Sequence, residues 1–297
     1  MKRVILATLF AVLIYAAADT RGAVRELAPG VYVRMGDRTR NQPANCGWVV
    51  FQDYVVVIDA NFPWGAREIL AEIKKTTNKP IRYVFNTHYH GDHAYGSSVF
   101  TDQGAAIVCS QACGEESRTK GQKAWDANTA SGEFSLKPYK LAHPAITFGQ
   151  SMAFDDGTHR IELSLVGPGH SRGDSVAYLP KEKILFTGDL AVNWNFGNNF
   201  ADADADHANW LRALDRMSLW DVRTLVPGHG ALGAMPELRA QAAYLKAVMD
   251  AVTAGIEAGK TPEQIAAMDF SAHPIATDKE RNLVSIRAVY KKMSGGH

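Results

Sequence analysis

The stretch that decides the fold, residues 81–93, reads Ile-Arg-Tyr-Val-Phe-Asn-Thr-His-Tyr-His-Gly-Asp-His. Its first seven residues are rich in β-branched and aromatic side chains, which predicts a buried strand over 81–87. The next six residues, 88–93, contain three histidines and one aspartate. Imidazole nitrogen and carboxylate oxygen are ligands that zinc accepts readily. The stretch therefore predicts a transition-metal site on a loop at the end of a rigid strand.

Three more candidate ligands lie beside glycines, each just after a predicted strand. His170 lies in Gly-Pro-Gly-His-Ser, Asp189 in Thr-Gly-Asp and His229 in Pro-Gly-His-Gly. Glycine lets the backbone bend and brings a neighbouring side chain into a crowded site. A lone histidine in a glycine loop is usually a turn residue, but three such loops in one chain are hard to obtain by chance. We therefore expect these residues to join the same metal site.

The rest of the chain alternates strand and helix patterns. Residues 27–35 and 46–60 are predicted to form a meander of strands with a turn at Gln52-Asp53, and further strands are predicted over 105–109, 145–154, 161–166, 175–179, 183–186 and 224–226. Helices are predicted over 65–75, 111–126, 208–217, 236–258 and 279–293, with a further one capped by Thr261. Strands followed by helices in two successive halves indicate two packed sheets with helices outside. No break in composition requires a second domain, so residues 19–297 are expected to form one domain that includes the C-terminal helices.

The first residues have the pattern of a secretory signal. Lys2 and Arg3 precede an apolar run over 4–18 that ends in three alanines. The run is shorter than the roughly 20 apolar residues that a membrane span needs. We expect residues 1–18 to be a signal peptide, the mature protein to be periplasmic or secreted, and no stable membrane span to remain after cleavage.

Charge and cysteine content narrow the function further. The 297 residues carry a net charge of only +1, which gives no electrostatic reason to expect nucleic acid as a partner. The three cysteines, Cys46, Cys109 and Cys113, form no CxxC pattern. One pair could bond in an oxidising compartment, but we favour small buried thiols over a disulfide.

A second acidic pattern suggests a calcium site. Asp202, Asp204 and Asp206 alternate along the chain, but the rest of a calcium-binding loop is missing. We interpret this segment as a solvated loop that ends in Asp206 as the N-cap of the following helix.

The ordered ligand set resembles the metallo-β-lactamase-fold superfamily of hydrolases, from about Leu27 through His229. The resemblance implies an α+β fold, a four-layer αββα sandwich with a dinuclear metal centre at one end of the two sheets. It further implies two zinc ions per chain. It assigns them to two ligand groups bridged by Asp189, the first being His88, His90 and His170 and the second Asp92, His93 and His229. Asp59, which closes a predicted strand, matches a position that supports the ligands from behind.

The chemistry of these residue types agrees with that resemblance. Three neutral imidazoles leave a metal ion its full charge, which lowers the pKa of bound water to about 7. A metal-bridging hydroxide could then attack a carbonyl, with Asp92 as the catalytic residue that orients it. The Gly-x-Ser-x-Gly pattern of serine hydrolases is absent around the candidate site.

The residue at position 189 helps to choose among branches of the superfamily. Aspartate there is typical of thioesterase, lactonase and nuclease branches, whereas many dedicated β-lactamases have cysteine or serine. The overall pattern resembles exported SoxH-like hydrolases, grouped as quinoprotein-relay metallohydrolases. We expect an exported dinuclear zinc hydrolase that acts on a small-molecule ester, thioester, lactone or lactam. The alternatives are a β-lactamase proper, or a non-catalytic or iron redox accessory protein on the same fold, because such ligands also accept iron or manganese.

Three aromatic residues follow strands that lead to the predicted site. Trp64, Trp194 and Phe196 are candidates for an apolar wall against the substrate. Ordinary packing explains such residues at least as well.

Overall fold

Two stacked β-sheets form the centre of the structure, and the helices pack on their outer faces. The computed structural model describes residues 21–193, 200–273, 276 and 278–295. The first sheet has the strand order β1-β2-β3-β4-β5-β6-β7. Its strands are β1 (Val24–Ala28), β2 (Val31–Arg34), β3 (Cys46–Val50), β4 (Val55–Ile58), β5 (Ile81–Phe85), β6 (Ala106–Ser110) and β7 (Ile146–Phe148). Strands β1 to β4 form an antiparallel meander, and β4 to β7 run parallel.

The second sheet has the order β13-β11-β10-β9-β8. Its strands are β8 (Ser151–Asp155), β9 (Arg160–Leu165), β10 (Ser175–Leu179), β11 (Ile184–Phe186) and β13 (Thr224–Val226), and a short pair joins β12 (Val192–Asn193) to β14 (His229–Gly230). Strand β10 is antiparallel to both β9 and β11, and β11 is parallel to β13. Strands β9, β11 and β13 therefore run in one direction and end at the same edge of the sheet.

One sequence-based boundary was wrong. Residues 145–154 were predicted as a single strand, but the structure divides them into β7 in the first sheet and β8 in the second. The chain bends at Gly149 and crosses between the sheets. Phe148 and Phe154 both point into the core between the two sheets, each from its own side. The continuous apolar pattern thus reflects one shared core and not one strand.

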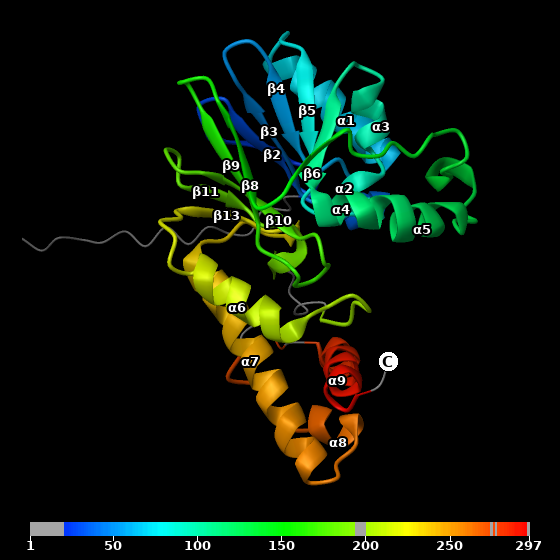
Figure 1. Ribbon diagram of the computed structural model, residues 1–297, viewed down its shortest axis with the longest axis vertical. Coiled ribbons are helices and arrows are strands. Elements are labelled where there is room, and N and C mark those ends of the chain that lie inside the picture. Colours follow the sequence, from blue (N-terminus) through cyan, green and yellow to red (C-terminus); the bar gives the residue numbers. More distant parts are fainter. Residues whose placement is uncertain (1–20, 194–199, 274–275, 277, 296–297) are drawn as a thin grey trace, which may run out of the picture.

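Helices cover the outer face of each sheet. They are α1 (Pro63–Thr76), α2 (Gly91–Ala94), α3 (Ser97–Thr101), α4 (Gln111–Glu116), α5 (Gln122–Asp126), α6 (His207–Met217), α7 (Met235–Glu257), α8 (Pro262–Ala266) and α9 (Lys279–Met293). Short turns complete the set: η1 (Arg38–Arg40), the π-helical η2 (Ser117–Gly121) between α4 and α5, η3 (Gly132–Phe134) and η4 (Gly188–Leu190). Figure 1 shows α1 and α3 beside the first sheet, α6 and α7 beyond the second, α9 alongside α7, and α8 near the far end of α7.

Three buried clusters show the order of the layers. Ile69 and Ile73 of α1 pack with Val57 of the first sheet. Residues from both sheets meet in a middle cluster that includes Phe85 and Leu163. On the far side, α6 and α7 pack against the second sheet in a cluster of apolar side chains that includes Val176, Leu185, Leu214 and Leu245. The predicted α+β fold with four αββα layers is therefore confirmed.

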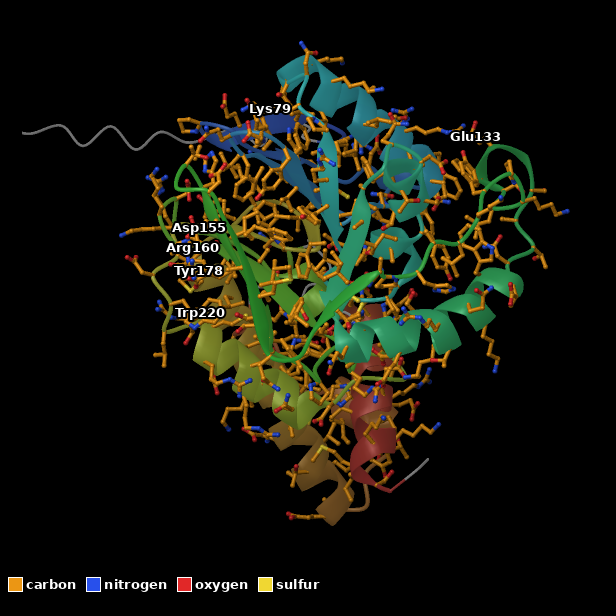
Figure 2. The ribbon with its side chains drawn as sticks, turned by 45° about the horizontal axis from the view of Figure 1, so that its top comes forward. Lys79, Glu133, Asp155, Arg160, Tyr178 and Trp220 are labelled. Atoms are coloured by element: carbon orange, nitrogen blue, oxygen red, sulfur yellow. The ribbon has the colours of Figure 1, made fainter. Side chains whose placement is uncertain are left out.

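The end of α6 is fixed to the second sheet by an aromatic contact. The ring of Tyr178 on β10 lies 5.4 Å from that of Trp220, and its hydroxyl donates to the carbonyl of Asp221 at 2.8 Å. Figure 2 shows Tyr178 and Trp220 along the same side of the molecule as Asp155 and Arg160, which form an ion pair at the β8–β9 turn. This contact adds to the buried apolar cluster that packs α6 and α7 against the sheet.

The C-terminal helices agree with the sequence signals. Thr261 and Gln264 form the predicted capping box at the start of α8. Ile265 of α8 and Ile286 of α9 are buried in the same cluster as α7. Among the described residues, no helix is both long and apolar enough to cross a membrane.

The layer of α6 can be tested with two matched leucines. Leu214 is fully buried between α6, α7 and the second sheet, whereas Leu219, just beyond α6, is 85% exposed. Leu214→Ala should lower the free energy of unfolding by about 2–5 kcal/mol because it leaves a cavity in the core. Leu219→Ala should change it by less than about 0.5 kcal/mol. Urea unfolding measures both, and equal effects would contradict the packing described here.

Candidate metal centre

The predicted ligands come from loops that follow parallel strands at one edge of the molecule. Asp59 follows β4 and His88 follows β5 in the first sheet, while Asp189 follows β11 and His229 follows β13 in the second. Backbone bonds join the two edges, since Ser175 N donates to the Thr87 carbonyl at 2.9 Å, and Asn45 N donates to the Gly228 carbonyl at 2.7 Å. The carboxyl ends of parallel strands are a common place for a binding site, because loops from several strands meet there.

The structure brings all seven predicted ligands together. They form overlapping groups whose ligand atoms lie within 4.8 Å of one another and that could each hold a metal ion: His88 with His90 and His170, His88 with His93 and Asp189, and Asp92 with His93 and His229. Asp189 lies between the groups, with Oδ1 3.1 Å from both His93 Nε2 and His229 Nε2, and Oδ2 3.5 Å from His170 Nε2. Two subsites that share one carboxylate are therefore possible.

Asp59 determines which nitrogens of two histidines face the cluster. Its carboxylate, 2% exposed, accepts Thr87 N at 2.8 Å and Thr87 Oγ1 at 2.9 Å, and lies 2.8 Å from His93 Nδ1. Because the Thr87 hydroxyl donates to Asp59, it can accept from His88 Nδ1, 3.1 Å away. When the Nδ1 atoms of His88 and His93 carry the protons, both Nε2 atoms direct a lone pair toward the cluster, where it can bind a metal ion.

The remaining imidazoles are oriented in a similar way. His229 Nδ1 faces the carbonyl of Pro43 at 2.9 Å, which leaves its Nε2 for the cluster. His90 Nδ1 faces the cluster at 2.9 Å from His170 Nε2, and its other nitrogen lies 3.6 Å from Asp202 Oδ2. The cluster is thus lined by nitrogen lone pairs and carboxylate oxygens that converge on a small volume.

Buried atoms without partners support a metal ion at this position. Among the described residues, His88 Nε2 and Asp189 Oδ1 face the cluster, are buried and form no hydrogen bond. Buried polar groups are rarely left in this state, and an ion that takes their lone pairs is one explanation. The donor set, with imidazoles and two carboxylates, suits zinc and other first-row metals. The residues therefore fit the metal that the sequence predicts.

The electrostatics of the cluster favour a cation. Burial lowers the pKa of His88 well below its usual value and lowers that of His170 to about 4. Burial opposes the charged forms of His93 and His229 as well, but the neighbouring carboxylates, Asp189 foremost, raise their pKa values. Burial likewise opposes ionisation of Asp189, yet His229 and His93 hold its pKa well below the ordinary range. A divalent cation would replace the protons that these carboxylates attract.

Glycines allow the close approach that this site needs. Gly188 has φ +52°, and a Cβ there would lie 2.4 Å from Thr87 Oγ1. A Cβ on Gly228 would lie 2.1 Å from Asp189 Oδ1. Any larger residue at these two positions would displace the ligand or the hydroxyl that orients one, which supports the role predicted for the flanking glycines.

Sequence analysis missed three participants. Thr87 was treated as the end of a strand, Pro43 had no signal because only its backbone is used, and Asp202 was interpreted as part of a solvated loop. That interpretation was wrong, because Asp202 faces His90, and Asp204 accepts from Tyr89 Oη and Lys120 Nζ, each at 2.6 Å. The cap formed by Asp206 is confirmed, since its side chain accepts from Asn209 N. The spacing of these carboxylates along the sequence does not show which distant part of the structure they contact.

The cysteines do not contribute donors to the cluster. Cys46, Cys109 and Cys113 are all free and buried, as predicted. Burial raises the pKa of Cys46 to about 12, so its thiol stays protonated and is a poor ligand or nucleophile.

One of the three candidate wall residues lies near α2. Trp64 is half-buried, its ring stacks on Phe62 at 5.0 Å, and Phe62 lies against Tyr95 at the end of α2. Trp194 and Phe196 lie outside the described residues. The wall therefore stays a prediction.

Comparison with known proteins agrees with this geometry. The family model for the metallo-beta-lactamase superfamily matches residues 39–229, which is more than half of the chain. The chain belongs to the metallo-β-lactamase superfamily. The match ends at His229, so α7, α8 and α9 lie beyond it.

Individual relatives are distant. Hydroxyacylglutathione hydrolase of Bartonella henselae is 28% identical over 155 residues, which cover 52% of this chain and 51% of that protein. Metallo-beta-lactamase type 2 of Elizabethkingia meningoseptica is 28% identical over 214 residues, covering 69% and 78%. The structure of a metallo-beta-lactamase from Pontibacter korlensis has a TM-score of 0.61 and 25% identity, and the match covers 75% of this chain and 98% of that one. The chain spans about half the length of the first relative. The prediction of a metal-dependent hydrolase is confirmed at the level of the superfamily.

The hydroxyl of Thr87 gives a test of the orientation of His88. Thr87→Val keeps the shape of the side chain but removes the group that links Asp59 to His88, so metal affinity should fall by about 10- to 100-fold. Thr87→Ser should retain it. Competition for zinc with a chromophoric chelator measures the affinity of each variant.

Thr101→Val is the matched control, because its hydroxyl bonds Ser98 O within α3 and away from the site. An unchanged affinity in Thr87→Val, or equal losses in both valine variants, would contradict the proposed link.

Proposed function

We propose that this protein is an exported dinuclear zinc hydrolase that cleaves a small carbonyl substrate: an ester, thioester, lactone or lactam. The observation that carries the proposal is the shared position of Asp189 between two groups of three donors. A protein that only bound a metal would need one such group. Zinc ions bound there would activate a water molecule and polarise the scissile carbonyl.

The assignment of ligands is part of this proposal. His88, His90 and His170 would hold one ion, Asp92, His93 and His229 the other, and Asp189 would bridge them. The oriented nitrogens described above supply the donors without rearrangement, which lowers the cost of forming the site. Asp59 would orient two of the ligands without binding a metal ion itself. It contacts His93 directly and His88 through the hydroxyl of Thr87.

Asp92 is placed to handle the proton of the attacking water. Its Oδ2 lies 3.3 Å from His229 Nε2, and its side chain is 23% exposed, more than that of Asp189 at 13%. One oxygen can serve as a ligand while Oδ1 accepts a proton. The bond from water oxygen to carbonyl carbon would form, the bond to the leaving group would break, and Asp92 would pass the proton to that group.

The substrate branch is supported by position 189 and by the relatives. Aspartate at this position favours a thioesterase or lactonase over a dedicated β-lactamase, and one relative is a hydroxyacylglutathione hydrolase. Trp64 would contribute an apolar wall beside α2. The signal pattern of residues 1–18 supports export, although these residues lie outside the described part of the chain. SoxH-like hydrolases remain the subtype that the sequence resembles.

Turnover on a small panel tests the proposal. The zinc-loaded protein should hydrolyse at least one of nitrocefin, an acyl-homoserine lactone, S-lactoylglutathione and a nitrophenyl ester, lose this activity with a chelator and regain it with zinc. Asp92→Asn should lower kcat by at least about 100-fold, because proton transfer contributes 10²–10⁴ in rate.

Asp53→Asn, at an exposed turn, is the matched control and should leave kcat unchanged. A protein that binds iron and hydrolyses no member of the panel would overturn the proposal in favour of a redox or accessory role. Hydrolysis that survives Asp92→Asn would overturn the role of Asp92 alone.

A further inference from the structure

A chain of four polar side chains runs from α4 to the loop that carries the first two proposed ligands. Glu116 ends α4, Lys120 lies one turn further on in η2, Asp204 lies in the loop before α6, and Tyr89 lies between those two ligands. Lys120 Nζ donates to Glu116 Oε1 at 3.3 Å and to Asp204 Oδ1 at 2.6 Å. Tyr89 Oη donates to the other oxygen of Asp204 at 2.6 Å. These four residues are called the Lys120 network below.

The other end of the Lys120 network contacts the loop after His170. Glu116 is 2% exposed, and its Oε2 accepts from Gly173 N at 3.0 Å. Ser110 Oγ, at the start of α4, donates to the carbonyl of Gly173 at 2.8 Å. A Cβ on Gly173 would lie 2.3 Å from Cys113 N, so the loop packs directly against α4. Because a buried carboxylate is costly unless it is paired, Glu116 and this loop hold each other in place.

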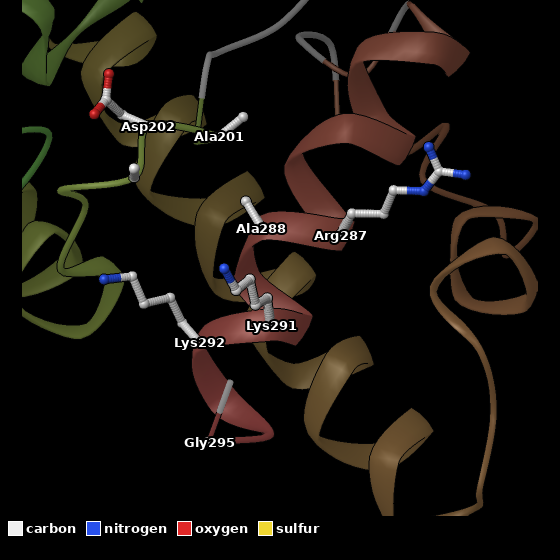
Figure 3. A pocket seen from close by; sticks show the side chains of 8 residues that line it. Ala201, Asp202, Arg287, Ala288, Lys291, Lys292 and Gly295 are labelled. Atoms are coloured by element: carbon white, nitrogen blue, oxygen red, sulfur yellow. The ribbon is translucent and has the colours of Figure 1, made fainter. Parts of the chain in front are cut away.

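The loop before α6 is turned toward His90 and away from the C-terminal helices. On its far side it borders a cavity beside α9, where Figure 3 shows the carboxylate of Asp202 directed away from Lys291. Oδ2 of Asp202 lies 3.6 Å from His90 Nε2, the nitrogen that points away from the ligand cluster. Asp204 follows two residues later and is held by Lys120. Lys120 therefore fixes the loop whose other carboxylate faces His90.

An ordinary surface ion pair is the simpler explanation of these contacts, and it accounts for only part of them. Exposed pairs four residues apart on a helix contribute little to stability. The Lys120 side chain is 48% exposed, which fits such a pair, but the side chains of Glu116 and Asp204 are only 2% and 17% exposed. Each of these carboxylates also binds a group from another loop. The turn that carries Lys120 is π-helical, a form that is rare and frequent at functional sites.

The Lys120 network contacts the loops of one proposed subsite only. Its two ends contact the loops that carry the three histidines assigned to one ion. Among the described residues, its four side chains form no hydrogen bond or ion pair with the three ligands assigned to the other ion. The backbone of η2 does reach the end of α2, since Tyr95 Oη donates to the carbonyl of Gly121 at 3.1 Å. That bond involves no side chain of the network, so substitutions in the network leave it in place.

We propose that the Lys120 network positions the three-histidine subsite, by holding its two loops at the separation at which His88, His90 and His170 can share one metal ion. This inference rests on the proposed dinuclear site and adds positioning residues to it. Groups outside the ligands change metal affinity by about 10- to 100-fold. Because the network acts on loops and not on the imidazoles themselves, we expect an effect near the lower end of this range.

The zinc affinity of each subsite, measured separately, tests the inference. His229→Ala leaves only the three-histidine group complete, and His170→Ala leaves only the other group complete. Adding Lys120→Met to His229→Ala should lower zinc affinity about tenfold. Adding it to His170→Ala should leave zinc affinity unchanged, because that subsite has no contact with the network. Competition for zinc with a chromophoric chelator measures all four proteins.

A second variant and a matched control accompany this comparison. Tyr89→Phe keeps the ring but removes the hydroxyl that donates to Asp204, and it should reproduce the loss in the His229→Ala background. Lys246→Met breaks an exposed ion pair with Asp250, 2.6 Å long, on α7. It should change zinc affinity in neither background.

The outcomes separate this inference from the proposed function. Equal losses in both backgrounds would mean that the Lys120 network acts through general stability, and would overturn the inference. Unchanged affinity on adding Lys120→Met or Tyr89→Phe to His229→Ala would overturn it as well. A wild-type protein that binds one ion would contradict the dinuclear site, whereas the comparison in His229→Ala would still decide the role of Lys120. A His229→Ala protein that binds no zinc would overturn both.

Discussion

The buried carboxylate of Asp59 is the interaction on which the candidate centre depends. It binds the backbone and hydroxyl of Thr87 after β5 and faces His93 in α2, so one side chain joins three elements. A charged group that is 2% exposed is costly unless it is fully paired. Asp59 is paired on both oxygens, and the same contacts fix the free nitrogens of His88 and His93. The contacts that satisfy the buried charge of Asp59 therefore also orient two of the proposed ligands.

The arrangement of strands explains why the other ligands meet these two. Strands β4 and β5 end at the edge where β9, β11 and β13 also end, and bonds such as Asn45 N to the Gly228 carbonyl hold the two edges together. Each ligand then needs only a short loop after its strand. Glycine at positions 188 and 228 permits those loops to approach within the distance that a shared metal centre requires.

Local patterns in the sequence predicted the elements that local forces determine. The bounds of α9 and the capping box at Thr261 followed from side-chain periodicity and cap chemistry. The candidate ligands could be named because histidine, aspartate and glycine at strand ends are chemically distinctive. Sequence could not reveal that 145–154 crosses between sheets, since both halves are apolar for the same shared core. It also could not place Asp202 against His90, because that contact depends on how a distant loop packs.

The part of the chain that matches the superfamily carries the candidate metal centre, and α7 to α9 lie beyond the match. The central claim remains that one shared carboxylate joins two metal subsites.

Anomalous diffraction at the zinc edge, from crystals of the zinc-loaded protein, tests that claim most directly. The account predicts two peaks per chain. One should lie among His88, His90 and His170, the other among Asp92, His93 and His229, with Asp189 in contact with both. A single peak, or peaks away from these seven residues, would contradict it.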